Sequence, residues 1–445
     1  MYIKRYARTL SIIGICAGMA VMAMIFSMVN TALPAIHTSL KTSIPALQWV
    51  MNIFGILTCS TLVIFGRLAD IYGRKKIFLF GLLMQGLALL GSGLASSITT
   101  IIFFQALAGI SNAIILAISQ AMLTHTISLR SRAIGLWAAV IGFCLAIGPL
   151  LSGLLISLFN WHWVFLAPLP IVILGIFLVS LFAEESKNKL DLPKLDIIGA
   201  LLLAATISCF ILGVIQGHLW HQTLIAMLYT FSAIFLVLLL IVEKTQAEPI
   251  IREDLFTNMR FLLASLTTFC LVFFIWAAFF LMPFFLQIEA LKSPLYTGII
   301  MLFVTIPVGL LSPYISKLYH RVSAKNLIFP GFIILLLSAL LQLRFTSTSS
   351  SLLFIMAALL FGIGWSFIWG PSTTAAISTL SQDRAGIASG TFMTIQEIGG
   401  TVGLAITVTI ARSKTNFSIG FHASMWVLAT ISLVGLIAAL LLNDK

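Results

Sequence analysis

Apolar runs about as long as a membrane is thick recur along the whole of this 445-residue chain. A helix needs about 20 mostly apolar residues to cross a bilayer, and in lipid every backbone group must be paired within the protein. Hydrophobic residues make up 60% of the chain and charged residues 9%, against about 25% charged in soluble domains. We therefore predict an all-α integral membrane protein with fourteen transmembrane helices, at residues 9–33, 46–66, 76–96, 100–123, 131–157, 163–183, 197–217, 222–242, 260–284, 296–317, 326–343, 351–374, 386–411 and 421–442.

The first apolar run, Thr9–Leu33, follows three basic residues, Lys4, Arg5 and Arg8. A secretory signal peptide has the same basic start, but its apolar region is shorter, at about 7–15 residues. We therefore expect this segment to be retained as the first helix.

The basic residues of the connections set the orientation. With a cytoplasmic N-terminus, 20 of the 25 Lys and Arg residues fall on the cytoplasmic side. This excess is what the positive-inside rule demands, and one helix more or fewer would scramble it. We expect an inner-membrane protein with both termini in the cytoplasm. The five basic residues expected outside are Lys41, Lys292, Arg344, Arg412 and Lys414.

Several classes of function are disfavoured. The net charge is +12, but the basic residues are scattered through short loops, so no nucleic-acid partner is expected. No phosphate-binding loop or nucleophile–base pair is present, so we expect no enzyme and no cofactor. The cysteines lie inside apolar segments without metal-ligand spacing, so neither a disulfide nor a metal site is expected; they are Cys16, Cys59, Cys144, Cys209 and Cys270.

An internal repeat indicates two related halves. The stretch Gly66–Lys75 follows the second span, and a degraded copy, Ser316–Lys325, follows the tenth. The two copies are in register if spans seven and eight are an insert. We expect six-helix bundles at residues 1–185 and 256–445, with linkers and two inserted helices at 186–255. Two parallel halves around a midplane site are a recurrent transporter plan.

The segment Gly66–Lys76 is the strongest local signal. Its glycines permit a tight turn and close helix approach, and its carboxylate, among basic residues, can form ion pairs that break when the bundle rocks. The alternative is an ordinary basic loop. We assign a conformational switch to Gly66, Asp70, Gly73, Arg74 and Lys75.

These motifs resemble the major facilitator superfamily, and within it the fourteen-helix drug:proton antiporters. Gly66–Lys76 matches the family's loop between helices 2 and 3. The stretches "VNTALPAIHTSL", "LQWV" and "GIASGTFMTIQEIGGTVGLA" look like further elements of this branch, so the resemblance covers nearly the whole chain. It implies a proton-coupled exporter of drug-like molecules.

The fifth span carries a glycine–proline interruption, "GFCLAIGPLLSG". Small residues let helices pack closely while freed backbone groups find partners, and a simple packing kink is the alternative reading. In the family this element favours antiport by limiting leak. The matching residues are Gly142, Gly148, Pro149 and Gly153.

Two charged positions of the branch are neutral in this chain. Ile25 stands where an acidic residue of the first helix is usual, and Gln105 stands where the fourth helix usually carries Arg. Both groups are linked to proton or cation handling in the family. Their absence puts proton coupling in doubt.

Glu397 is predicted to be the one acid deep in the membrane. It lies about 16 Å from the start of its span, near the midplane. An intramembrane carboxylate costs at least ~2.5 kcal/mol and is a functional candidate by default. We assign it to proton coupling; the alternative is a neutral acid that packs against a polar neighbour.

Polar and aromatic residues inside the spans predict a cavity. Amides are expensive in lipid and are expected to face the bundle interior, whereas each Trp could line the cavity or anchor the interface. A mainly apolar, aromatic cavity suits amphipathic organic molecules. The candidates are Asn30, Trp49, Asn52, Gln105, Trp276, Trp365, Trp369 and Gln396.

The leading hypothesis is therefore a secondary transporter that exports amphipathic small molecules by proton antiport with alternating access. An uncoupled or metabolite-specific transporter is the first alternative, and a non-transporting receptor or scaffold the second. Expected partners are the bilayer, a small-molecule substrate and protons, with the chain acting as a monomer.

Overall fold

The computed structural model describes residues 2–127, 129–186, 197–216, 220–245, 257–319, 321–377, 385–414 and 416–442. These residues form helices and connections without strands, and fourteen helices are long and apolar enough to cross a membrane. The predicted fold class and span count are confirmed. The linkers Glu184–Asp196 and Glu243–Asp254 lie largely outside the described residues.

The first half contains six spans. Its helices are α1 (Tyr2–Leu40), α2 (Ile44–Tyr72), α3 (Arg74–Gly93), α4 (Ile98–Thr126), α5 (Arg130–Leu158), and α6 (His162–Leu166), which leads into α7 (Leu169–Phe182). Serine side chains cap two of the starts: Ser43 accepts from the Ala46 amide, and Ser97 from that of Thr100. Such caps satisfy amide groups that a helix start leaves unpaired.

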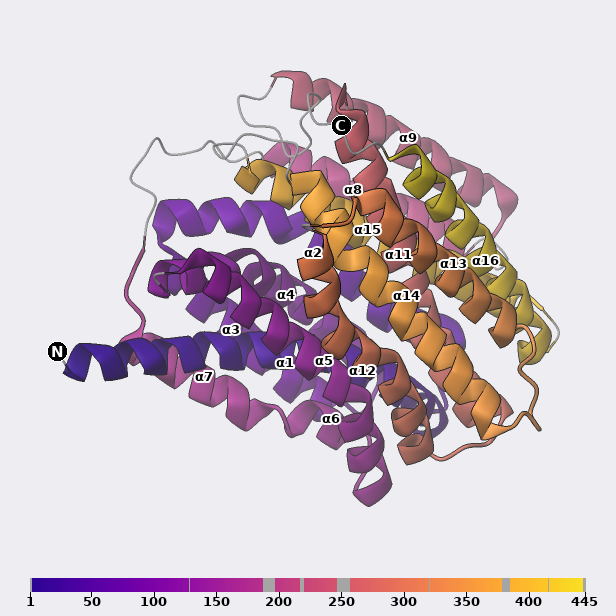
Figure 1. The fold of residues 1–445 in the computed structure, drawn as a ribbon. Helices are drawn as coiled ribbons and strands as arrows, with labels where there is room; N and C mark the ends of the chain where they lie inside the picture. Colours follow the sequence, from indigo (N-terminus) through magenta and orange to yellow (C-terminus); the bar gives the residue numbers. More distant parts are fainter. Residues whose placement is uncertain are drawn as a thin grey trace.

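Two helices follow outside the bundle, α8 (Ile197–Gln216) and α9 (Gln222–Thr245). The second half contains α11 (Met259–Phe284), η1 (Phe285–Glu289), α12 (Pro294–Leu318), α13 (Ala324–Gln342), α14 (Ser351–Ile377), α15 (Ala385–Arg412) and α16 (Phe417–Leu441). Figure 1 shows the helices of this half inclined to those of the first half.

Several helices extend beyond their predicted limits, among them α1 and the ninth span. α1 continues seven residues beyond the predicted Leu33 and contains Pro34. The ninth span does not end at Phe284 but continues through η1 to Glu289. Hydropathy detects the part of a helix that needs lipid, whereas backbone pairing decides where the helix stops, so both helices outlast their apolar runs.

The halves meet mainly along three pairs of helices: α2 with α15, α5 with α12, and α1 with α11. We call this contact the seam. We call the side on which α1 begins the terminal side; fourteen spans return α16 to that side, and the opposite side is the far side.

The seam is tight on the far side and opens toward the terminal side. Along α5, an added Cβ at Gly153 would lie 2.5 Å from the Pro294 carbonyl oxygen, and one at Gly142 would lie 4.0 Å from the Gly309 Cα. A Cβ at Gly135, nearest the terminal side, would meet no atom within 4 Å. The structure is therefore closed on the far side.

The inserted helices lie against the seam from outside. α8 contacts both α2 and α15, and α9 packs on α8. The buried side chains of α8 in this contact are aliphatic, and they meet Ile56 and Cys59 of α2 and Ala405 of α15; those of α8 are Leu203, Ile207, Ile211 and Ile215.

Candidate functional site

The α2–α15 contact joins polar residues of the two halves. Near its far end, Gln48 Nε2 donates to the Ala405 carbonyl oxygen at 2.9 Å and to Thr409 Oγ1 at 3.3 Å. Farther in, the space beside Gly55 is filled by Thr401 and the Trp276 ring. These contacts join a helix of each half through a line of polar and small residues.

Glu397 lies on this line, one helical turn from Thr401. Its residue is 8% exposed, and Thr401 Oγ1 donates to its backbone carbonyl at 2.7 Å. The Gln396 side chain hydrogen-bonds its carboxyl group, and Cys59 of α2 lies nearby. The structure thus places the predicted coupling acid of the second half against a helix of the first.

An aromatic cluster crosses the seam beside this acid. Phe26 of α1 and Phe54 of α2 lie 5.1 Å and 6.1 Å, by ring centroids, from Trp276 of α11. Trp276 also fills the space beside Gly400, one turn from Glu397. The cluster continues through Phe279 to Trp365, which stacks on Trp369 at 5.5 Å.

The structure therefore brings three predicted tryptophans together. Trp276 and Trp365 are 5% and 1% exposed, so these two are interior residues and not interface anchors. Trp49 does not join them, because it packs with the aliphatic residues around α8. Asn30 donates to the Phe26 carbonyl at 2.8 Å, one turn from the cluster. Asn52 is fully buried in α2 and neither side-chain polar atom has a partner.

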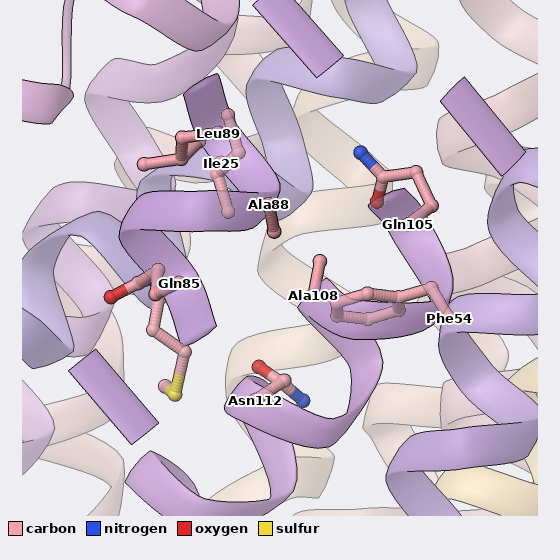
Figure 2. A pocket seen from close by; sticks show the side chains of 9 residues that line it. Ile25, Phe54, Gln85, Ala88, Leu89, Gln105, Ala108 and Asn112 are labelled. Atoms are coloured by element: carbon pink, nitrogen blue, oxygen red, sulfur yellow. The ribbon is translucent and has the colours of Figure 1, made fainter. Parts of the chain in front are cut away.

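Gln105 lies elsewhere, in a small cavity inside the first half (Figure 2). This cavity is bounded by α1–α4, and Ile25 is part of the same wall. The two positions at which the sequence departs from the antiporter pattern are therefore spatial neighbours. Ile25 and Gln105, both uncharged, therefore border the same cavity.

The predicted switch segment is held by an ion pair and an unexpected carboxylate. Arg74 Nη2 and Nε donate to Asp70 Oδ1 at 3.0 and 3.1 Å. Gly73 has φ +114°, and an added Cβ there would collide with the Glu185 carboxylate. Glu185 also accepts from the Lys75 amide at 3.0 Å. Gly66 lies within α2, where a Cβ would make only an ordinary contact.

Glu185 was missed by sequence reasoning, which placed it among the acids of a cytoplasmic connection. It follows the last helix of the first half and caps the start of α3, more than a hundred residues earlier in the chain. The sequence does contain a signal for this contact: a pair of acids, Glu184 and Glu185, follows the sixth span, and a glycine with three basic residues follows the second.

The glycine–proline element of α5 makes close approaches on two sides. Gly148 lies against Ser27 and the Met24 carbonyl of α1, and Ser152 Oγ donates to the Met28 carbonyl at 2.8 Å. On the other side the Pro149 carbonyl lies against Gly298 of α12. The element therefore holds α1 and α12 at once, the latter across the seam.

Comparison with known proteins agrees with this architecture. The sequence profile described as "Major Facilitator Superfamily" matches residues 15–404. The chain is 30% identical over 401 residues to multidrug resistance protein Stp of Mycobacterium tuberculosis, covering 88% of this chain and 74% of that protein. It is 23% identical over 444 residues to riboflavin transporter RibZ of Clostridioides difficile, covering 97% and 96%.

A solved structure supports the fold alone. A POT family transporter in complex with 5-aminolevulinic acid superposes with a TM-score of 0.71 at 15% identity, covering 99% of this chain and 97% of that one. Fourteen spans, two halves that meet along one seam, and a profile match over most of the chain lead to one assignment: the chain belongs to the Major Facilitator Superfamily of membrane transporters.

Proposed function

We propose that this protein exports amphipathic small molecules across the cytoplasmic membrane by proton antiport, with the two halves opening alternately to either side. The observation that carries the proposal is Glu397, a buried carboxyl group on the seam, one turn from the Trp276 contact. Residues 1–185 and 256–445 are the moving bodies, residues 186–255 are the insert, and the monomer is the working unit. The 20 basic residues on one side support cytoplasmic termini.

Proton exchange at Glu397 would couple to opening of the seam. A buried carboxylate without a cationic partner is costly, whereas its protonated form can be buried. Closing α2 against α15 therefore favours the protonated acid, and opening lets it lose the proton to water. Relatives named for multidrug resistance support small organic molecules as substrates.

The test is transport in proteoliposomes with an imposed pH gradient, recording efflux of a panel of uncharged and cationic compounds together with proton movement. We expect the gradient to accelerate transport by the native protein. Glu397→Gln should lose this acceleration but still exchange substrate across the bilayer without a gradient.

Glu289→Gln is the matched control, because Glu289 ends a membrane helix without lying on the α2–α15 line, and it should keep gradient-driven transport. Normal coupling in Glu397→Gln would rule out the assigned role.

A second candidate function is uncoupled transport of a metabolite. It is favoured by the neutral pair Ile25 and Gln105, which share one cavity, and by the relative named for riboflavin transport. Transport by the native protein that ignores the pH gradient would favour this candidate.

A further inference from the structure

The cavity inside the first half has an unusual wall. Three amide side chains from two helices border it: Gln85 of α3, and Gln105 and Asn112 of α4. Figure 2 shows Gln85 across the space from the two α4 amides. Most of the remaining wall is aliphatic, and Phe54 closes one side.

The hydrogen-bonding capacity of this wall is not used up within the protein. Gln85 is 5% exposed and its Oε1 is buried without a partner. Gln105 is also 5% exposed. Asn112 Nδ2 donates to Thr58 Oγ1 at 3.3 Å, which is long for such a bond. A buried amide without a partner destabilises the protein, and a ligand group that pairs with it recovers that loss.

The size of the cavity limits what can enter. The centre of a water-sized sphere can move through about 20 Å³, and a site needs roughly 10–15 Å³ by this measure to hold one water. The space therefore suits one small polar group, such as a hydroxyl or a carbonyl, and not a whole drug-sized molecule.

The charge of the wall limits the chemistry further. None of the nine residues that line the cavity is ionisable in the range of biological pH. A charged group that entered would lose its hydration without gaining a counter-charge, which is far more costly than burying a paired hydroxyl or carbonyl. The cavity therefore selects uncharged groups.

The cavity adjoins the seam. Phe54 forms part of its wall, and its ring also lies 6.4 Å from Phe26 and 6.1 Å from Trp276 in the aromatic cluster. The amides thus lie directly behind Phe54, one ring of the aromatic cluster. A molecule that parted this cluster would need only a short polar arm to reach past Phe54.

We propose that Gln85, Gln105 and Asn112 form a subsite for one uncharged hydrogen-bonding group of the transported molecule, whose flat apolar part lies against Phe26, Phe54 and Trp276. This inference rests on the proposed function as a small-molecule transporter and specifies its substrate class: uncharged amphipathic compounds with a hydroxyl, carbonyl or amide group. Fixed cations are poor ligands of this subsite.

The test is equilibrium binding to the purified full-length protein without any gradient. The probes are riboflavin and chloramphenicol, which are uncharged at pH 7 and carry hydroxyl and amide-type groups, and ethidium and rhodamine 6G, which are cations. We expect the native protein to bind the uncharged pair more tightly. Gln105→Leu should weaken binding of the uncharged probes by about tenfold, equivalent to ~1.4 kcal/mol, and leave the affinity for the cations unchanged.

Two further variants separate a ligand role from a packing role. Gln85→Met should also weaken binding of the uncharged probes, while its unfolding temperature stays equal or rises because an unpaired buried oxygen is removed. Gln342→Met is the matched control. Gln342 is a fully buried glutamine with an unpaired oxygen, but it lies in α13, outside this cavity. It should bind all four probes as the native protein does.

The proposal is overturned if neither uncharged probe binds the native protein, if the cations bind at least as tightly, or if the cavity variants weaken both classes equally or not at all. A water molecule as sole occupant would give the last of these results. Loss of gradient dependence would count against proton antiport and leave the binding result standing. Normal coupling with unselective cavity variants would overturn the subsite alone.

Discussion

At the scale of single residues, Glu397 lies on the face of α15 that meets α2, so its carboxyl group interacts with both halves. Its neighbours include Gln396 on its own helix, Thr401 one turn on, and Cys59 of α2. In the proposed mechanism, a proton bound at Glu397 changes the interaction energy across the seam directly, without a relay through other side chains.

Gly73 offers a test of the switch segment. We expect Gly73→Ala to destabilise the protein by about 1–3 kcal/mol, because φ of +114° strains any residue with a Cβ and the new methyl group would displace the Glu185 carboxylate. Thermal unfolding in detergent measures this. Gly86→Ala is the control, since its Cβ would meet the nearest atom, of Val172, at 3.7 Å; equal unfolding temperatures for the two variants would contradict the argument.

Glu185 offers a second test at the same scale. Its carboxylate accepts the amide hydrogens of Lys75 and Ser186, so Glu185→Ala leaves the Lys75 amide at the start of α3 without its acceptor. Loss of a helix cap typically costs about 1 kcal/mol, and we expect faster amide hydrogen exchange at the start of α3. Glu184→Ala should leave that exchange unchanged, and equal exchange in both variants would remove the assigned role of Glu185.

The sequence predicted some of these residues and not others, for physical reasons. The buried position of Glu397 was predictable, because an acidic residue twelve residues into an apolar span must lie deep in the membrane. Glu185 was not, because its partner amides lie over a hundred residues away and any exposed acid near a basic loop looks the same. Trp49 was a cavity candidate as an aromatic residue inside a span, but which side of α2 faces α8 depends on packing that no local pattern encodes.

At the scale of helices, α5 and α12 touch through backbone atoms, which cannot move aside for an added side chain. A side chain at Gly298 would press on the Pro149 carbonyl, whereas one at Gly309, on the same helix, would meet nothing within 4 Å. We expect Gly298→Val to block closure of the far side and to slow transport by at least about tenfold, because overpacking a close contact forces the helices apart.

Gly309→Val should transport at close to the native rate, and initial rates in proteoliposomes compare the two. Similar losses in both variants would mean that the valine acts through α12 itself and not through the α5 contact.

The number of helices could be predicted from the sequence, whereas the pairs of helices that contact each other could not. Apolar length alone gave all fourteen spans, including the two inserted ones. The pairing of α2 with α15 and of α5 with α12 arises from small residues scattered over distant segments, such as Gly55 with Thr401 and Gly153 with Pro294. Lipid solvates every outer face alike, so hydropathy does not distinguish a seam from a lipid-facing surface.

At the scale of the whole molecule, the need for the far side to open can be tested by cross-linking α5 to α12. Thr305 Oγ1 donates to the Ala146 carbonyl at 2.9 Å across the seam. In a background without the five native cysteines, cysteines at positions 146 and 305 should form a cross-link with an oxidant or a short thiol reagent.

We expect cross-linked protein to lose transport and to recover it on reduction. Either cysteine alone should be insensitive to oxidant. Full transport by the cross-linked protein would show that the far side need not open.

The aliphatic face of α8 has a mechanical consequence. Hydrophobic contacts are non-directional and depend on area more than on angle, so Leu203, Ile207 and Ile211 can slide over α2 and α15 with little change in energy. When the two halves tilt, α8 can stay in contact with both α2 and α15. Lipid acyl chains are then kept away from the carboxyl group of Glu397. If the halves alternate as proposed, α8 would therefore shield the carboxyl group of Glu397 from lipid in every state of the cycle.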